Sequence, residues 1–224
     1  MKNKNLEIAC FNIESAIIAQ QNGADRIELC ANMLEGGTTP DFGTAQKVRA
    51  GLDIKMNVMI RPRGGNFVYT DAEFEQMKSE IEQFKKINVD GFVFGILNND
   101  NSYDSVRNKE LVTLAGSVPC TFHRAFDVVE NVFESLESLI DCGFKTVLTS
   151  GQEENVMRGI EVLKTLEEKA KGRIVVMPGG GLRSSNIEIL DQKVNAFYYH
   201  SSAITDSSEI ANGDEVKKIK EHLL

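Results

Sequence analysis

Residues 121–127 read TFHRAFD, a stretch that places a titratable ring, a fixed cation and a carboxylate close together. The apolar run VPCTF overlaps its start and is typical of a buried strand, so these side chains are expected where that strand ends. A histidine there transfers protons near neutral pH, an arginine binds an anion, and an aspartate orients either one. We therefore interpret His123 and Asp127 as candidate catalytic residues and Arg124 as a candidate substrate-binding residue.

Two further motifs carry residue types that would complete such a site. In RIELC (26–30), alternate residues share one face of a strand, so Glu28 is expected inside the fold as a general acid or base. MIRPRGG (59–65) places Arg61 and Arg63 on either side of a proline, and guanidinium groups bind carboxylate or phosphate through paired hydrogen bonds. We expect both arginines to bind an anionic substrate. The alternative is a structural ion pair between Arg61 and Glu28.

A glycine run and a histidine-serine run follow the last two expected strands. MPGGG (177–181) precedes HSS (200–202), and the corresponding loops of many barrels bind phosphate through backbone N–H groups. VLTSG (147–151) ends the strand before them and adds hydroxyl groups to the same region. The alternative is a glycine-rich turn that binds no ligand. The candidate anion-binding residues of these segments are Ser150, Gly179, Gly180, His200 and Ser201.

The elements that must position these residues alternate along the whole chain between strand-like and helix-like patterns. Strands are expected at 6–11, 26–30, 55–61, 91–97, 119–125, 145–150, 173–180 and 196–202. Helices are expected at 13–24, 41–52, 71–89, 105–117, 130–142, 153–170 and 184–192. This alternation predicts a single (β/α)8 TIM-like barrel over residues 1–202, whose strands end at one mouth. An open doubly wound sheet is the alternative, but CFNIES stands where its glycine-rich turn would follow the first strand.

Composition limits the class of partner. The chain has 224 residues, 42% of them hydrophobic and 26% charged, which is typical of a globular protein with a sizeable core. A net charge of −8 argues against nucleic acid and against an anionic membrane as main partners. The start MKNKNLEIAC lacks the apolar core of a signal peptide, so we expect a cytoplasmic protein. We expect no organic cofactor and a homo-oligomer, with the short helix of residues 203–224 packing on the barrel or on a partner subunit of a dimer.

Several motifs occur together in an order that resembles the CutC family. They are NGADRIELC (22–30), EGGTTP (35–40), MIRPRGG, TFHRAFD, VLTSG and MPGGG. The resemblance covers about residues 6–202, which is most of the chain. It implies a TIM barrel and an association with copper homeostasis.

The cysteines bear on copper binding, because Cu(I) prefers thiolate and thioether ligands. Cys10 and Cys30 lie near the ends of neighbouring expected strands, and they are the metal ligands we expect. Alternation opposes this pairing: if Glu7 faces inward, Cys10 faces the helices unless the strand bulges.

Two hypotheses on function therefore stand. One is a CutC-like copper homeostasis protein that binds Cu(I) through Cys10 and Cys30. The other is an enzyme that acts on a small anionic, phosphorylated metabolite at the barrel mouth. In this second hypothesis Glu28 and His123 transfer protons.

Overall fold

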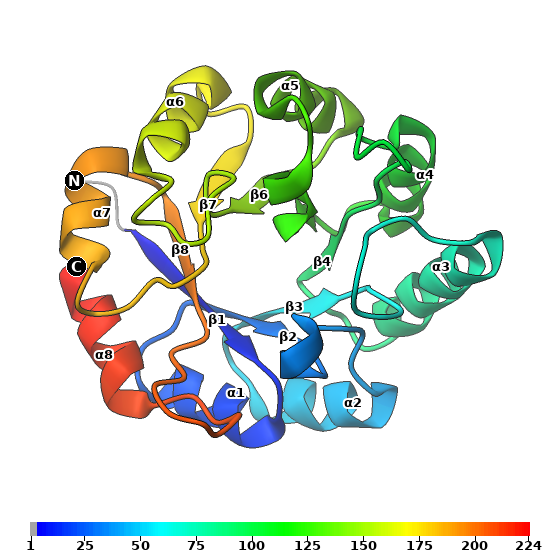
Figure 1. Ribbon diagram of the computed structural model, residues 1–224. Coiled ribbons are helices and arrows are strands. Elements are labelled where there is room, and N and C mark those ends of the chain that lie inside the picture. Colours follow the sequence, from blue (N-terminus) through cyan, green and yellow to red (C-terminus); the bar gives the residue numbers. More distant parts are fainter. Residues whose placement is uncertain (1–3) are drawn as a thin grey trace.

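The computed structural model describes residues 4–224, in which strands and helices alternate along the chain (Figure 1). The strands are β1 (Asn5–Cys10), β2 (Arg26–Leu29), β3 (Lys55–Met59), β4 (Gly91–Phe94), β5 (Cys120–Phe122), β6 (Thr146–Thr149), β7 (Val175–Pro178) and β8 (Tyr198–Ser201). The α-helices are α1 (Ile13–Gln21), α2 (Phe42–Gly51), α3 (Asp71–Lys85), α4 (Ser105–Ala115), α5 (Val132–Cys142), α6 (Ile160–Ala170), α7 (Ile187–Val194) and α8 (Gly213–His222). Two 3-10 helices, η1 (Met33–Glu35) and η2 (Arg124–Val128), follow β2 and β5.

The strands form one parallel sheet that curls into a nearly closed barrel with the helices around it (Figure 1). Their order is β7-β6-β5-β4-β3-β2-β1-β8, so each strand lies beside its neighbour in sequence or beside the first strand. A parallel bridge between Gly179 and His200 joins the end of β7 to β8. The predicted TIM-like barrel is therefore confirmed, and all strand ends face one mouth.

The side-chain alternation of the strands separates an apolar outer layer from a polar interior. Ile8, Ile27 and Val58 are fully buried in the hydrophobic core that also contains the inner faces of the helices. Their neighbours Glu7, Glu28 and Asn57 are buried too, but they interact with polar side chains inside the barrel. Burying so many polar groups costs free energy unless they are hydrogen-bonded. Packing alone therefore does not explain why polar residues occupy the interior of the barrel.

Gly91 shows how tightly this interior is fitted. A Cβ at this position would lie 2.2 Å from Asn57 Oδ1, so β4 has room for the amide only because it carries a glycine there. Asn57 in turn donates a hydrogen bond from Nδ2 to Glu7 Oε2 at 3.1 Å. The Asn57 amide thus helps to fix the position of the Glu7 carboxylate inside the barrel.

Several expected elements have other bounds in the structure, and two of these differences lie near the ends of β5 and β6. The helix expected at 153–170 begins only at Ile160, and the chain before it forms a loop in which Gly151 and Gln152 adopt positive φ. This loop is held by a hydrogen bond from the Val156 N–H to the Gly180 carbonyl at 2.9 Å. The strand expected at 119–125 ends at Phe122, and the chain enters η2 directly afterwards.

The C-terminal helix α8 packs against α1, α7 and β1. Lys220 forms an ion pair with Asp25 at 2.8 Å, and Glu215 accepts hydrogen bonds from the backbone N–H and the hydroxyl of Ser184. In this way the tail occupies the helix position that follows β8. Within residues 4–224, no helix combines the length and the apolar character that crossing a membrane requires.

Candidate active site at the barrel mouth

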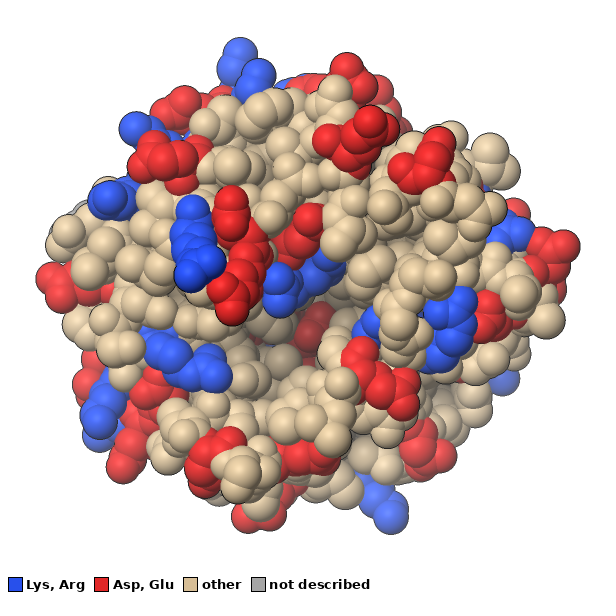
Figure 2. All heavy atoms as spheres, in the orientation of Figure 1, with Lys and Arg blue, Asp and Glu red and all other residues tan. Residues whose placement is uncertain are grey.

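A cavity of about 440 Å³ opens at the C-terminal ends of the strands. Figure 2 shows it as a hollow near the middle of this face, with acidic and basic side chains gathered around it. Its wall combines buried residues of the strands with residues of the loops that follow them. The wall includes Glu28, Cys30, Met59, Arg61, Phe67, His123, Arg124, Asp127, Gly180, Arg183, His200 and Ser201.

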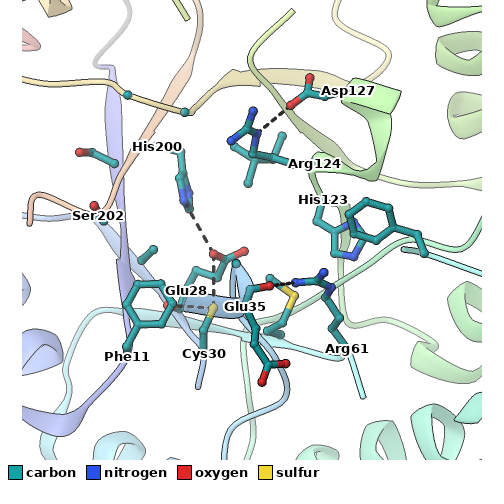
Figure 3. Close-up of a pocket in the computed structure, with 18 of the residues that line it drawn as sticks. Phe11, Glu28, Cys30, Glu35, Arg61, His123, Arg124, Asp127, His200 and Ser202 are labelled. Carbon is teal, nitrogen blue, oxygen red and sulfur yellow. Dashed lines mark hydrogen bonds and ion pairs between the residues drawn. The ribbon is translucent and has the colours of Figure 1, made fainter. Parts of the chain in front are cut away.

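His200 and Glu28 lie on one side of the cavity (Figure 3), and the fully buried Glu7 behind them completes a chain of three titratable groups. His200 Nδ1 lies 2.8 Å from Glu7 Oε1, and its Nε2 lies 3.7 Å from Glu28 Oε2. β8 pairs with β1 so that Glu7 and His200 are register partners, which brings these side chains together. Glu7 also forms an ion pair with Arg26 deeper in the barrel. The ion pair of Glu28 with Arg61, which was the alternative interpretation of these residues, is absent from the described residues; His200 is the ion-pair partner of Glu28 instead.

The surroundings move the pKa values of these groups apart. Burial raises the pKa of Glu28 to about 7, aided by the charge of Glu7 and opposed by His200. Burial acts on Glu7 in the same direction, but Arg26 and His200 outweigh it and lower its pKa to about 2. Burial alone would lower the pKa of His200, yet its hydrogen bond to Glu7 and the charge of Glu28 raise it. A carboxyl group with a pKa near 7 is suited to exchange protons at neutral pH.

His123 lies on the opposite side of the cavity, next to Arg61 (Figure 3). Its Nδ1 accepts a hydrogen bond from the Ala125 N–H at 3.3 Å, and its ring packs against Phe67 with centroids 4.9 Å apart. Burial and the charge of Arg61 lower the pKa of His123 to about 3, so its imidazole is neutral at physiological pH.

Arg61 is buried without a carboxylate partner among the described residues. Its Nη1 donates to the carbonyls of Glu35 and Gly37, each at 2.8 Å, and its Nη2 donates to the Gly65 carbonyl at 3.0 Å. These bonds tie the loops after β2 and β3 together, but carbonyl groups do not neutralise the charge. A buried guanidinium group that lacks a counter-ion favours an anion in the cavity.

Three residues of the cavity wall each carry one buried side-chain atom that has no hydrogen-bond partner within the described residues. These atoms are Glu28 Oε1, Arg61 Nε and His123 Nε2. Their side chains are at most 5% exposed, so bulk water does not compensate for the missing partners. The residues of the cavity wall therefore include one carboxyl oxygen and two nitrogen atoms without partners.

Arg124 and Asp127 stand at the rim, where η2 positions them (Figure 3). Asp127 accepts hydrogen bonds from the Thr149 hydroxyl at 2.5 Å and from the Ser150 N–H at 3.0 Å, and it pairs with Arg124 Nε at 2.7 Å. Arg124 also donates to the Ser150 hydroxyl at 2.9 Å. Because β5 ends at Phe122, Arg124 lines the cavity instead of facing the helices. Asp127 thus orients Arg124, one of the two residues it was expected to orient.

Arg183 is a cavity residue that sequence reasoning missed. It follows the glycine run after β7, and its guanidinium group donates to the carbonyls of Leu182 and Ile204 and to the Ser201 hydroxyl. Its position directly after GGGL at a strand end is the signal that could have identified it. Phe67 was missed as well, and nothing in the local sequence distinguishes it from other loop residues.

The remaining candidates lie near the cavity or apart from it. Arg63 does not line it: its Nε forms an ion pair with Glu73 at 2.6 Å, and its Nη1 and Nη2 donate to the loop 64–68. Gly180 lies at the wall beside Arg124, whereas Gly179 packs behind it against Leu148 and His200. The Ser150 hydroxyl accepts a hydrogen bond from Arg124 and donates one to Asp127.

The two cysteines expected as metal ligands are joined by a backbone hydrogen bond, but their side chains belong to different hydrophobic clusters. The Cys30 N–H donates to the Cys10 carbonyl at 2.9 Å. Cys10 packs with Ile8 in the core between barrel and helices, while Cys30 lines the cavity with Met59. Burial, with the charge of Glu28, raises the pKa of both thiols well above its ordinary value. Among the described residues, no group of three or more His, Cys, Asp or Glu side chains is arranged to hold a metal ion.

Comparisons with known proteins give a consistent family. The model of the CutC family matches residues 4–205. The copper homeostasis protein cutC homolog of Mus musculus is 46% identical over 198 residues, which cover 88% of this chain and 73% of that protein. The family protein CutC of Photorhabdus laumondii is 44% identical over 88% of this chain and 79% of its own length.

Solved structures agree with the fold. The crystal structure of CutC from Streptococcus agalactiae has a TM-score of 0.86 and 33% identity, and it covers 90% of this chain and 100% of its own. N-(5'-phosphoribosyl)anthranilate isomerase from Pyrococcus furiosus has a TM-score of 0.67 at 16% identity, covering 98% of each chain. At that identity the likeness extends to the barrel fold alone.

Proposed function

This chain belongs to the CutC family, whose curated relatives include proteins named for copper homeostasis, and we propose that its mouth cavity binds a small organic anion and transfers protons on it. One observation carries the proposal: Glu28, Arg61 and His123 line the same cavity, and each has one buried side-chain atom (Oε1, Nε and Nε2) without a hydrogen-bond partner among the described residues. Each buried polar atom without a partner costs about 1–3 kcal/mol. A ligand with acceptor groups for the two donors and a donor for the carboxyl oxygen would offset this cost.

The charges around the cavity support an anionic ligand. Arg61 and Arg183 have no carboxylate partner in the described residues, and Arg124 pairs with Asp127 at the rim of the cavity. Guanidinium groups bind carboxylate and phosphate oxygens through several hydrogen bonds. These three arginines surround a cavity of about 440 Å³, a volume that suits a metabolite and not a macromolecule.

The opposite side supports proton transfer. Glu28 has a pKa of about 7, and His200 is held by Glu7 with its other ring nitrogen toward Glu28. A carboxyl group of this kind gives or takes a proton at neutral pH without a large energetic penalty. We therefore assign the exchange of protons to Glu28, with His200 and Glu7 as the groups that position it.

The test is a thermal-shift screen of small organic phosphates and carboxylates against the wild type and two arginine variants. Arg61→Ala removes the buried guanidinium group, and Arg63→Ala removes its neighbour in the same loop that pairs with Glu73 outside the cavity. Each shift is measured relative to the melting temperature of the same variant without ligand. We expect stabilisation of the wild type and of Arg63→Ala that is lost in Arg61→Ala. The absence of any stabilising compound, or equal loss in both variants, would contradict the proposal.

Direct binding of Cu(I) is a second candidate, favoured by the contact of the Cys30 thiol with Met59 at the cavity wall. The expected pair of Cys10 and Cys30 stays a prediction, as do a cytoplasmic location and a dimer. An anaerobic Cu(I) titration against a competing chelator tests the pair in Cys10→Ser, Cys30→Ser and the double variant. Equally tight binding in the double variant would exclude both thiols. Weakening in Cys30→Ser alone would place the ion in the cavity without Cys10.

A further inference from the structure

The hydrogen bonding of His123 fixes which ring nitrogen carries its proton. Its Nδ1 accepts from the Ala125 N–H at 3.3 Å. A neutral imidazole that accepts at Nδ1 carries its proton on Nε2. Nε2 has no partner among the described residues, and His123 is one of the residues of the cavity wall. His123 therefore presents a buried N–H donor to the ligand and no basic nitrogen.

The surroundings hold this donor in a fixed position. Phe67 packs against both side chains, with its ring centroid 4.9 Å from that of the His123 ring and 5.0 Å from Arg61 Cζ. A Cβ at Gly95 would lie 2.8 Å from His123 Nδ1, so the ring packs directly on the backbone that follows β4. A donor that does not need to reorient is well suited to stabilise charge that develops on a ligand oxygen.

From this geometry we infer that His123 and Arg61 donate hydrogen bonds to the carbonyl oxygen of the substrate while Glu28 removes a proton from the adjacent carbon. The inference rests on the proposed function and names its substrate class, a small anionic carbonyl compound. The C–H bond breaks and a new O–H bond forms on the Glu28 carboxylate. The C–H electron pair becomes the C=C bond of an enolate, whose negative charge resides on the former carbonyl oxygen. Return of the proton reverses the step, so no oxidant, reductant or cofactor takes part.

The arrangement of the cavity matches this division of roles. Glu28 and His200 lie on one side, and His123 and Arg61 lie on the other, with the open space between them (Figure 3). Arg124 and Arg183 stand at the wall nearer the rim, where they would hold the anionic group of the substrate. His123 keeps its proton throughout, so it acts as a hydrogen-bond donor and not as the proton carrier that the sequence led us to expect.

The state of His123 is measurable without any ligand. In protein with 15N-labelled histidine, long-range proton–nitrogen correlation spectra distinguish the two neutral tautomers from the imidazolium ion. We expect His123, assigned by comparison with His123→Gln, to be neutral with its proton on Nε2 between pH 5 and pH 8 (about the range in which an ordinary histidine titrates). An Nδ1–H tautomer or an imidazolium ion in this range would overturn the inference.

Binding of a matched pair of probes tests the chemistry. Phosphoglycolohydroxamate carries a phosphate and a planar oxyanion that resembles an enediolate, and glycerol 3-phosphate carries the phosphate alone. Because enzymes bind such analogues far more tightly than ground-state compounds, we expect calorimetry to show a preference of about 100-fold for the hydroxamate. His123→Phe, which removes the donor, should reduce that preference about tenfold or more, and His123→Gln, which keeps an N–H donor, should retain part of it.

The outcomes separate the two proposals. Equal affinity for both probes, or a preference that survives in His123→Phe, would overturn the inference and leave the anion-binding proposal standing. Absence of binding by both probes and by every compound of the thermal-shift screen would contradict the proposed function itself, and the inference with it.

Discussion

Replacement of Glu28 by glutamine should make the protein more stable at alkaline pH. The carboxyl group is 3% exposed, one of its oxygens has no partner, and its pKa is about 7 in the folded state against 4.5 ordinarily. A raised folded pKa means that the folded state binds the proton more tightly than the unfolded state. The contribution of Glu28 to stability is therefore complete below pH 4.5 and is lost as the pH rises through 7.

The magnitude follows from the two pKa values. Their difference corresponds to about 3 kcal/mol in the free energy of unfolding, which the wild type loses between pH 4.5 and pH 8 and Glu28→Gln does not. For a chain of this length, that is a difference of roughly 6–12 °C in melting temperature. Circular dichroism melts of both proteins at pH 5 and pH 8.5 measure it, with Glu35→Gln on the exposed rim as control.

The control and the pH series decide the outcome. We expect the stability of Glu28→Gln relative to the wild type to rise between pH 5 and pH 8.5, while that of Glu35→Gln stays constant. A Glu28→Gln variant that is destabilised by the same amount at both pH values would refute the reasoning. It would mean that Glu28 is a satisfied structural ion pair with His200.

Three further predictions concern neighbouring groups. The pKa of His123 is about 3 in the folded state, so the wild type should lose up to about 5 kcal/mol in free energy of unfolding as the pH falls from 6.5 toward 3. The urea midpoint of His123→Gln should decline less over the same pH range than that of the wild type. Gly91→Ala should lower the free energy of unfolding by about 1–3 kcal/mol, since its Cβ meets Asn57, whereas Gly51→Ala, with nothing within 4 Å, should be neutral or stabilising. Gly180→Ala should weaken the binding of anionic compounds in calorimetry, because φ is +106° and the new Cβ would lie 3.1 Å from Arg124 Cζ; unchanged affinity would exclude Arg124 from the anion site.

The fold could be predicted because periodicity and strand count are properties of the local sequence. Alternation in RIELC correctly separated Glu28 from Ile27, and the rule that strand ends share one mouth correctly grouped Glu28 with His123. Alternation also anticipated the position of Cys10, which packs in the outer core. These inferences needed only the period of a strand and the direction of a parallel sheet.

The partners of the site residues could not be predicted in the same way. His200 reaches Glu28 because β8 pairs with β1 in one particular register, and a shift by one residue would turn its ring outward. Arg61 and Arg63 both follow the end of β3 at Met59, yet only Arg61 lines the cavity, whereas Arg63 reaches Glu73. Loop conformation, not residue type, decided which arginine enters the cavity.

The most direct measurement is a crystal structure of the protein with a compound that stabilises it in the thermal-shift screen. We predict ligand acceptor atoms within about 3 Å of Arg61 Nε and His123 Nε2, and a ligand carbon or donor that faces Glu28 Oε1. A ligand bound outside the cavity, or one inside it that leaves all three atoms without a contact, would contradict the account.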